Sequence, residues 1–300
     1  MKSLTIFKVG QKKKMYGHSW IAKNSESNVI IVTGMEEHAK RYHDFASFLN
    51  KSKMSVYSMD YYGQGENTVH GDGKLGVVPV GAFELFTEDV ISLALKLKAT
   101  GKPLYILGHS MGSFLTQRIV QKQSKLFDKA VIVGSNGPTP LFKLGKIAAN
   151  ITVTKKGRDK VSKLLASLAI GSYAKSVKNP RTPTDWISHN AENVDLYNAN
   201  PLDGHPSSKG FYFELLSGTS KLYKQENYQN VRRDLPLFII AGKDDPVGLF
   251  GKGVEKLHTF YENLGFTAAE LKIYENMRHE ILNETNKKEV YEDVLKFLKK

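Results

Sequence analysis

One stretch of the sequence has the residue types of a nucleophilic serine. Residues 108–112 follow the pattern G-x-S-x-G, and the apolar run before them, over 103–107, is typical of a buried strand. Helix-type sequence resumes after Gly112. A turn of this kind projects the hydroxyl of Ser110 above the carboxyl edge of a sheet and directs the amide of Met111 at a developing negative charge. Alone, the motif also fits a serine that merely caps a helix, so the chain must supply further groups.

A nucleophilic serine needs a histidine as general base, and on this topology the histidine comes last in the chain. Two of the nine histidines, His258 and His279, follow both the motif and a strand that leads to an acid. His279 lies in the loop after an expected strand over 269–274, from which an imidazole can reach Ser110. His258 falls inside an expected helix over 251–264, where a histidine is more often a surface or packing residue. The sequence therefore favours His279.

The acid should follow the end of a strand. The strand over 130–133 leads into a segment without a carboxylate, whereas the strand over 235–241 leads to Asp244 and Asp245. Adjacent side chains generally point in different directions, so one of the two accepts the imidazole N–H and fixes its tautomer. We favour Asp245, with Asp244 as a solvated or turn-capping carboxylate.

An ester-cleaving serine also needs two backbone donors for the oxyanion. The amide of Met111 is one. The loop after an earlier strand, at Gly34 and Met35, is the natural source of the second, the amide of Met35. The alternative is that Gly34 only serves a turn.

Apolar runs and helical patterns alternate along most of the chain, which predicts a mostly parallel sheet with helices on both faces. An antiparallel pair is expected at the N-terminus, where the second run partly alternates between polar and apolar residues. Strands are expected at 2–9, 13–22, 29–32, 54–59, 103–107, 130–133, 235–241 and 269–274, and helices at 42–52, 82–99, 111–124, 251–264 and from 286.

The alternation stops between about 136 and 210, where helical stretches at 140–151 and 159–173 precede a turn-rich piece. We interpret 136–210 as a helical cap inserted between two parts of one core, 1–135 and 211–300. Four apolar residues of the cap lie at helical spacing and either line an acyl channel or pack against the sheet: Leu164, Leu165, Leu168 and Ile170.

The composition narrows the class of protein. The chain has 300 residues and no cysteine, which excludes disulfides and thiol catalysis and fits a reducing compartment. It shows neither an apolar run long enough to span a membrane nor a signal-peptide pattern, so we expect a cytoplasmic protein. The net charge of +13 is spread over the whole chain without a nucleic-acid motif, so we expect no nucleic-acid partner; contact with an anionic membrane surface stays open.

With these residues in place, nearly the whole chain resembles one group of serine α/β-hydrolases, the monoacylglycerol lipases and lysophospholipases. This group is itself similar to serine aminopeptidase S33. Two departures stand out: Thr33 precedes Gly34 where the group usually has histidine, and Gln64 lies between two glycines where the group again has histidine. The resemblance rests on residues 34–38 with 41–42, Asp60 with 63–65, 108–112, 242–248, 278–280 and the cap segment 185–202.

The resemblance implies an α/β-hydrolase fold with an eight-stranded, mostly parallel sheet and an inserted helical cap. It also implies Ser110 as nucleophile, Asp245 as acid, His279 as base, and the amides of Met35 and Met111 as oxyanion donors. We therefore expect a carboxylic ester hydrolase for mono-acyl lipids or simple esters, without a metal or organic cofactor. A non-catalytic scaffold that binds a ligand, and an acyltransferase, are the alternatives.

Overall fold

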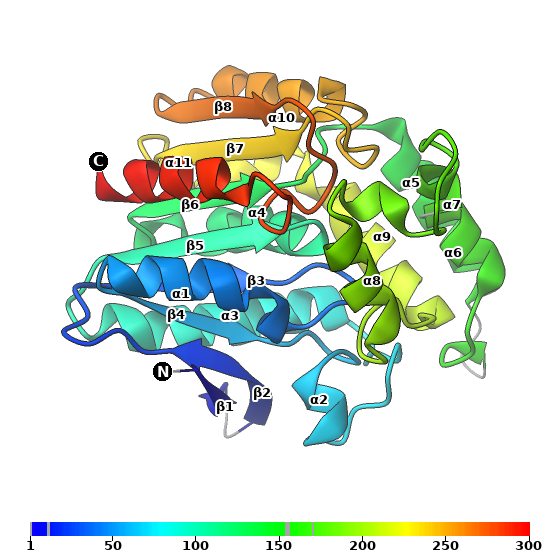
Figure 1. The fold of residues 1–300 in the computed structure, drawn as a ribbon, viewed down its shortest axis with the longest axis horizontal. Helices are drawn as coiled ribbons and strands as arrows, with labels where there is room; N and C mark the ends of the chain where they lie inside the picture. The colour runs from blue at the N-terminus through cyan, green and yellow to red at the C-terminus, as the bar shows by residue number, and fades with distance from the viewer. Residues whose placement is uncertain (1, 11–12, 154–156, 170) are drawn as a thin grey trace.

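The computed structural model describes residues 2–10, 13–153, 157–169 and 171–300. Their strands form one eight-stranded sheet in the order β1-β2-β4-β3-β5-β6-β7-β8 (Figure 1). All eight lie where the sequence predicts strands, and no end is shifted by more than two residues. Their bounds are β1 Lys2–Val9, β2 Lys13–Trp20, β3 Ser27–Val32, β4 Met54–Met59, β5 Leu104–His109, β6 Lys129–Val133, β7 Leu237–Gly242 and β8 Ala269–Tyr274.

The sheet is antiparallel at one edge and parallel elsewhere. The strand β2 pairs antiparallel with both β1 and β4, and the later pairs are parallel. The central strands β3, β5 and β7 are buried along their whole length, because helices cover both faces of these continuous apolar runs. In contrast, Leu4 and Ile6 of β1 are exposed, as expected for an edge with one solvated face. The prediction of a mostly parallel sheet is confirmed.

Two hydrophobic clusters, one on each face of the sheet, form the core. The larger cluster joins the strands to buried residues of α3, α4 and α10, and the second joins them to α1 and α11 (Figure 1). The helices outside the cap are η1 Ala39–Tyr42, α1 His43–Lys51, α2 Glu66–Val69, α3 Ala82–Lys98, α4 Met111–Gln123, η2 Ser124–Leu126, η5 Gln225–Tyr228, α10 Lys252–Asn263 and α11 Lys287–Lys299.

Further helices lie beyond the ends toward which the parallel strands point (Figure 1). They are α5 Pro140–Thr152, α6 Lys163–Ala169, α7 Gly171–Ala174, η4 Asp185–Ile187, α8 Ala191–Ala199 and α9 Lys209–Leu222. The helix expected at 140–151 is confirmed. In place of one helix over 159–173, the described residues form the shorter α6 and α7, and the sequence analysis missed α9.

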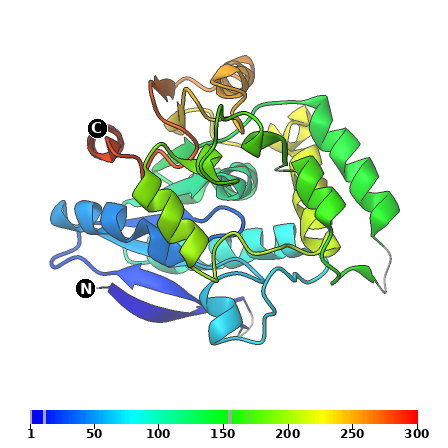
Figure 2. The same ribbon diagram turned by 45° about the vertical axis from the view of Figure 1, so that its right-hand side comes forward.

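The helix α9 connects this helical layer to the core. It packs against α5 on one side and against α3 and α4 on the other, and in Figure 2 it lies between the outer green helices and the sheet. Its Gly218 faces the ring of Phe83 of α3, so closely that a Cβ there would collide with the ring. The division into a core of 1–135 and 211–300 and a cap of 136–210 stays a prediction.

Among the described residues, no helix is both long and apolar enough to cross a bilayer.

Candidate active site

Ser110 lies in the sharp turn between β5 and α4. Its backbone angles, φ 54° and ψ −122°, belong to a conformation that a residue with a side chain adopts only under constraint. Its amide donates to the carbonyl of Val133 at the end of β6, at 3.0 Å. Gly108 and Gly112 permit the turn, because a Cβ on either would collide with a backbone carbonyl. The tight packing holds the serine at the carboxyl edge of the sheet.

His279 and Asp245 lie together in the loops that follow β8 and β7. The Nδ1 atom of His279 is 3.0 Å from Oδ2 of Asp245, and both side chains are buried. The other carboxylate oxygen accepts the amide of Val247 at 2.8 Å. Gly242, at the end of β7, lies so close to the carbonyls of Met277 and Arg278 that it has no room for a Cβ. The two loops therefore pack directly on each other, which fixes the carboxylate against the imidazole.

The loop with His279 also lies beside the turn with Ser110. The ring centroids of His109 and His279 are 4.7 Å apart. A Cβ on Gly134, which follows β6 and has φ +58°, would lie 3.1 Å from Cε1 of His279 and 3.4 Å from Cδ2 of His109. Both imidazoles thus lie over the end of β6, the strand whose last carbonyl accepts the amide of Ser110. A hydrogen bond between Ser110 and His279 stays a prediction.

The two weaker candidates from the sequence lie elsewhere. The half-exposed Asp244 accepts from Nε2 of His189 at 2.8 Å. His258 lies on α10, and its Nε2 is 3.0 Å from the carbonyl of Ala269, at the opposite end of β8 from His279. The structure therefore brings Asp245 and His279 together and leaves Asp244 and His258 outside this contact.

The loop after β3 lies against the nucleophile. A Cβ on Gly34 would lie 3.1 Å from Cβ of Ser110, so the peptide between Gly34 and Met35 borders the serine. Gln64 holds this loop from behind: its Nε2 donates to the carbonyls of Gly34 and Glu37, both at 3.0 Å, and its Oε1 accepts the amide of Glu36 at 2.9 Å. Gln64 is fully buried, so this departure from the family pattern has a structural role.

Met111 is the first residue of α4 and is buried beside Ser110. At the N-terminus of a helix its amide has no partner within the helix and adds to the positive end of the helix dipole. Met35 is partly buried and packs on the larger hydrophobic cluster. Both amides thus border the serine from opposite loops, and their role as oxyanion donors stays a prediction.

A buried carboxylate links the loop after β3 to the turn with Ser110. Oε1 of Glu37 accepts the amide of Gly34 and, at 2.7 Å, the hydroxyl of Tyr42, and it lies 3.3 Å from Nδ1 of His109. Burial opposes ionisation of Glu37, but the bond to His109 and the charges of His109 and Arg41 outweigh it and lower its pKa to about 2. Glu37 is therefore ionised and holds three segments together.

One guanidinium joins the loop after β8 to the segment 191–203. Arg41 donates to Oε2 of Glu280 at 2.6 Å, to Asp203 at 3.3 Å and to Asn193 at 3.1 Å. Its guanidinium also lies over the ring of Tyr197, 4.9 Å from the centroid. Glu280 directly follows His279, whereas the other three partners belong to 191–203, so Arg41 positions the histidine loop and this segment relative to each other.

The aromatic ring of Trp186 packs beside His279. It lies 5.3 Å from the imidazole, and the ring of Tyr173 lies 5.1 Å from Trp186. Burial, with a smaller contribution from the charge of Asp245, raises the pKa of Tyr173 to about 12. The phenol of Tyr173 is therefore uncharged at neutral pH. Among the described residues, no cluster of three or more histidine, aspartate or glutamate side chains could hold a metal ion.

The apolar cap residues that the sequence singled out have different positions. Leu165 is buried in the larger core cluster, which supports the packing alternative for this residue, and Leu164 is 60% exposed. The side chain of Leu168 and the whole of Ile170 lie outside the described residues.

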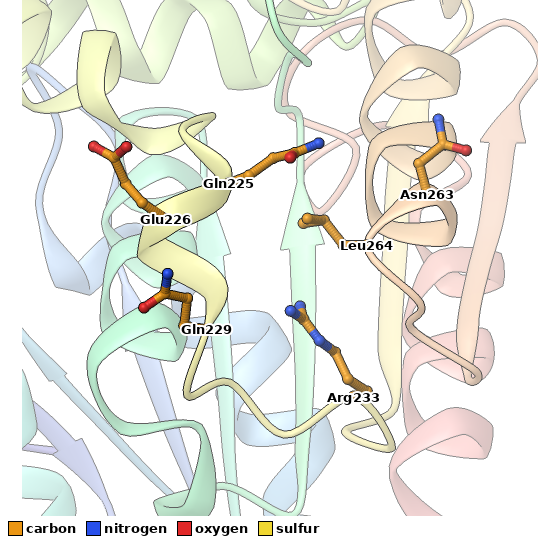
Figure 3. Close-up of a pocket in the computed structure, with 6 residues that line it drawn as sticks. All are labelled: Gln225, Glu226, Gln229, Arg233, Asn263 and Leu264. Atoms are coloured by element: carbon orange, nitrogen blue, oxygen red, sulfur yellow. The ribbon is translucent and has the colours of Figure 1, made fainter.

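A surface hollow of about 420 Å³ lies away from these residues (Figure 3). Its lining comes from the segments that precede β7 and β8, at the amino ends of the parallel strands, whereas Ser110, Asp245 and His279 lie at the carboxyl ends. The hollow is thus not the site of the predicted chemistry. It is lined by Gln225, Glu226, Gln229, Arg233, Asn263 and Leu264.

Sequence reasoning assigned no role to His109, Glu37, Arg41 or Gln64, although each contacts the site. His109 occupies a variable position of the serine motif, and the other three lie in segments that carried the family resemblance. That clustering of polar residues next to expected strand ends was the only signal available.

Comparisons with known proteins agree with this geometry. The family model described as serine aminopeptidase, S33 matches residues 23–286. A monoglyceride lipase homolog of monkeypox virus is 24% identical over 89% of this chain and 86% of its own length. A monoacylglycerol lipase of Mycolicibacterium smegmatis is 24% identical over 90% of this chain and 87% of its own. A thermostable carboxyl esterase from Bacillus coagulans, solved with glycerol, superposes with a TM-score of 0.88 at 21% identity, covering 99% of this chain and 98% of its own.

Proposed function

The chain belongs to the serine aminopeptidase S33 family and is a serine ester hydrolase of the α/β-hydrolase fold, and we propose that Ser110, His279 and Asp245 cleave the ester bond of mono-acyl lipids. One observation carries the assignment of the residues: the buried 3.0 Å contact between Nδ1 of His279 and Asp245, next to the turn with Ser110. With Nδ1 donating to the carboxylate, Nε2 is the nitrogen left to act as base.

The reaction then proceeds in two halves. Ser110 Oγ attacks the ester carbonyl while Nε2 of His279 takes the hydroxyl proton, and Asp245 stabilises the imidazolium. The amides of Met35 and Met111 donate to the oxyanion of the tetrahedral intermediate. His279 returns the proton to the departing alcohol, which leaves an acyl group on Ser110. Water enters, gives a proton to Nε2 and attacks the acyl carbonyl; the bond to Ser110 Oγ breaks, the proton passes from Nε2 to Oγ, and the fatty acid is released.

The preference for mono-acyl lipids rests on the relatives and on the aromatic rings beside the imidazole of His279. The viral and mycobacterial relatives are named as monoglyceride and monoacylglycerol lipases, and the rings of Trp186 and Tyr173 provide an apolar surface beside His279. Lysophospholipids and simple esters are the other members of the substrate class that this surface suits.

A lipid substrate also requires access to a membrane, and we propose that α5 and α6 make this contact. Leu144, Ile147 and Ile151 recur at helical spacing on α5 and are 60, 58 and 77% exposed; Leu164 of α6 is also exposed. The segment 143–163 contains seven basic residues and one acidic residue. An exposed apolar stripe in a basic stretch of the sequence suits the surface of an anionic bilayer.

The first experiment compares hydrolysis of monoacylglycerols with different chain lengths by the wild type and by three variants. Ser110→Ala and His279→Ala should each lower kcat/KM at least about 10³-fold, and Asp245→Asn about 10²- to 10⁴-fold. The matched control Asp244→Asn, in the half-exposed neighbour, should stay within about twofold. If His279→Ala or Asp245→Asn retained wild-type activity, the assignment of these residues would be wrong.

Two measurements separate the alternatives. A burst of alcohol release equal to the enzyme concentration, with acyl-enzyme seen by mass spectrometry at Ser110, would support the covalent pathway. Added glycerol distinguishes an acyltransferase, because that enzyme would accumulate transesterified product instead of fatty acid. A wild type that cleaves no ester of the series would favour the non-catalytic scaffold.

The membrane contact is tested with vesicles of phosphatidylcholine that contain or lack phosphatidylglycerol. The protein should bind the anionic vesicles, and Ile147→Ser should weaken this binding without changing turnover of a water-soluble ester. Leu95→Ser serves as control, since Leu95 is similarly exposed but lies on α3. Equal binding of the two variants would refute a contact through α5.

A further inference from the structure

His109, the residue before the serine, lies between two hydrogen-bond acceptors. Its Nδ1 is 3.3 Å from Oε1 of Glu37, and its Nε2 is 3.3 Å from the backbone carbonyl of His279. The imidazole is buried, 5% exposed, so neither nitrogen can exchange its protein partner for bulk water.

A neutral imidazole cannot satisfy this arrangement. It carries one N–H, whereas a carbonyl oxygen and a carboxylate both need a donor. The carboxylate is ionised, because the amide of Gly34 and the hydroxyl of Tyr42 already donate to the same oxygen of Glu37. A lone pair of the ring facing either oxygen would be repelled and left unpaired in a buried place. Only the imidazolium, with two N–H groups, donates to both.

The surrounding charges agree with this geometry. Burial lowers the pKa of His109, but the bond to Glu37, the charges of Glu37 and Glu280 and the bond to the His279 carbonyl outweigh it and raise the pKa overall. Arg41, the other cation nearby, is already paired with Glu280 and Asp203. The edge of the Tyr42 ring, 6.4 Å away, completes the surroundings.

We propose that His109 is a positioning residue, held as an imidazolium between Glu37 and the carbonyl of His279, whose charge disfavours protonation of the neighbouring imidazole of His279 and so leaves it able to act as a base. This inference rests on the proposed role of His279 as general base. It adds a second role for the same contact, because the bond from Nε2 of His109 to the His279 backbone also fixes the loop that presents the base.

The charge acts over a short distance. The two ring centroids are 4.7 Å apart, so a cation on His109 disfavours a second proton on His279. The groups that oppose this effect are Asp245, in direct contact with His279, and Glu37, on the far side of His109. Trp186 and the neutral Tyr173, on the cap side, add no charge. Removal of the cation at His109 should therefore favour the protonated, inactive form of His279.

The first test observes the resting enzyme and needs no substrate. In wild-type protein with ¹⁵N-labelled histidine, nuclear magnetic resonance at pH 7 should show both ring nitrogens of His109 protonated and the ring of His279 protonated at Nδ1 alone. A neutral His109 at pH 7 would overturn the proposal, whatever the catalytic role of His279.

The second test uses His109→Gln, which removes the cation and leaves the carboxylate of Glu37. The acid limb of the kcat/KM profile for ester hydrolysis should move to higher pH. His258→Gln, a change of the same type on α10, should leave the profile unchanged. An unshifted acid limb in folded His109→Gln protein would also refute the proposal.

These outcomes are distinct from a failure of the proposed function. If His279→Ala retained full activity, the base would be another group, yet the spectra would still decide whether His109 is charged. If His109→Gln did not fold, the spectra of the wild type alone would confirm or refute the imidazolium.

Discussion

The side chain of Gln64 should control the orientation of one oxyanion donor. Its Nε2 holds the carbonyl oxygen of Gly34 at 3.0 Å, and that carbonyl belongs to the same planar peptide unit as the amide of Met35. In a trans peptide the C=O and N–H bonds point in opposite directions. A bond that draws the Gly34 carbonyl toward Gln64 therefore turns the Met35 amide toward the serine side of the loop.

Replacement of Gln64 by Met keeps the length of the side chain and removes its donor and acceptor. Three buried backbone groups lose their partner: the carbonyls of Gly34 and Glu37 and the amide of Glu36. Each such group costs about 1–3 kcal/mol when left unpaired, and local relaxation recovers part of this, so we expect a loss of about 3–5 kcal/mol in the free energy of unfolding. Because loss of an oxyanion donor costs about 10²–10³ in kcat, a loosened Met35 amide should lower kcat about 10- to 100-fold.

The assay combines urea unfolding with ester hydrolysis at saturating substrate, measured on protein shown to be folded. Gln123→Met is the control, since Gln123 is exposed at the end of α4 and its replacement should change stability by less than about 0.5 kcal/mol. A Gln64→Met protein with wild-type kcat would show that the Gly34 carbonyl does not orient the oxyanion donor. A stability loss below about 1 kcal/mol would show that the three backbone groups find other partners.

Three further predictions follow from single contacts. Arg41→Met removes the cation between Glu280 and Asp203 and should lower the free energy of unfolding, measured with urea, by about 3–5 kcal/mol. A loss under about 1 kcal/mol would contradict the view that Arg41 joins these two segments. Burial lowers the pKa of His205 to about 4, so the unfolded chain binds this proton more tightly than the folded protein does. The free energy of unfolding should therefore fall by about 3 kcal/mol as the pH drops from about 6.5 to about 4. In urea titrations at several pH values, His205→Asn should reduce this dependence on pH. Gly134→Ala places a methyl group 3.1 Å from Cε1 of His279, at a φ of +58°, and should lower kcat at temperatures where the variant is still folded. An unchanged kcat would mean that the imidazole can move aside.

The sheet could be predicted because its signal is local. Continuous apolar runs such as 29–32 and 237–240 form strands wherever both faces are covered, and each run is long enough to be recognised alone. Order along the chain then constrained the site, since loops after successive parallel strands meet at one edge. This is why residues as distant as Asp245 and His279 could be expected together, and the structure places them 3.0 Å apart.

What the sequence could not provide depends on contacts between distant segments. Asp244 and Asp245 are the same residue type side by side, and only the direction of each side chain distinguishes the buried one from the surface one. The helix α9 packs against α5 on one side and against the core on the other. Its apolar residues therefore do not gather on one face, and the sequence shows only a weak helical pattern there. Gln64 was visible only as a departure from a family pattern, and its three backbone partners belong to a loop about thirty residues earlier.

The buried charges around the oxyanion loop explain why His109 and Arg41 must both be cations. Glu37 and Glu280 are carboxylates with almost no access to water, and a buried charge without an opposite charge is strongly destabilising. Arg41 lies 2.6 Å from Glu280 but 3.7 Å from Glu37, so it neutralises the first better than the second. The imidazolium of His109 supplies the remaining charge from the other side of Glu37. Neutral His109 would leave Glu37 without its nearer cation, beside His279, which would favour the protonated, inactive form of the base. The same two cations thus stabilise the loop that holds the proposed oxyanion donor and keep the histidine available for proton transfer.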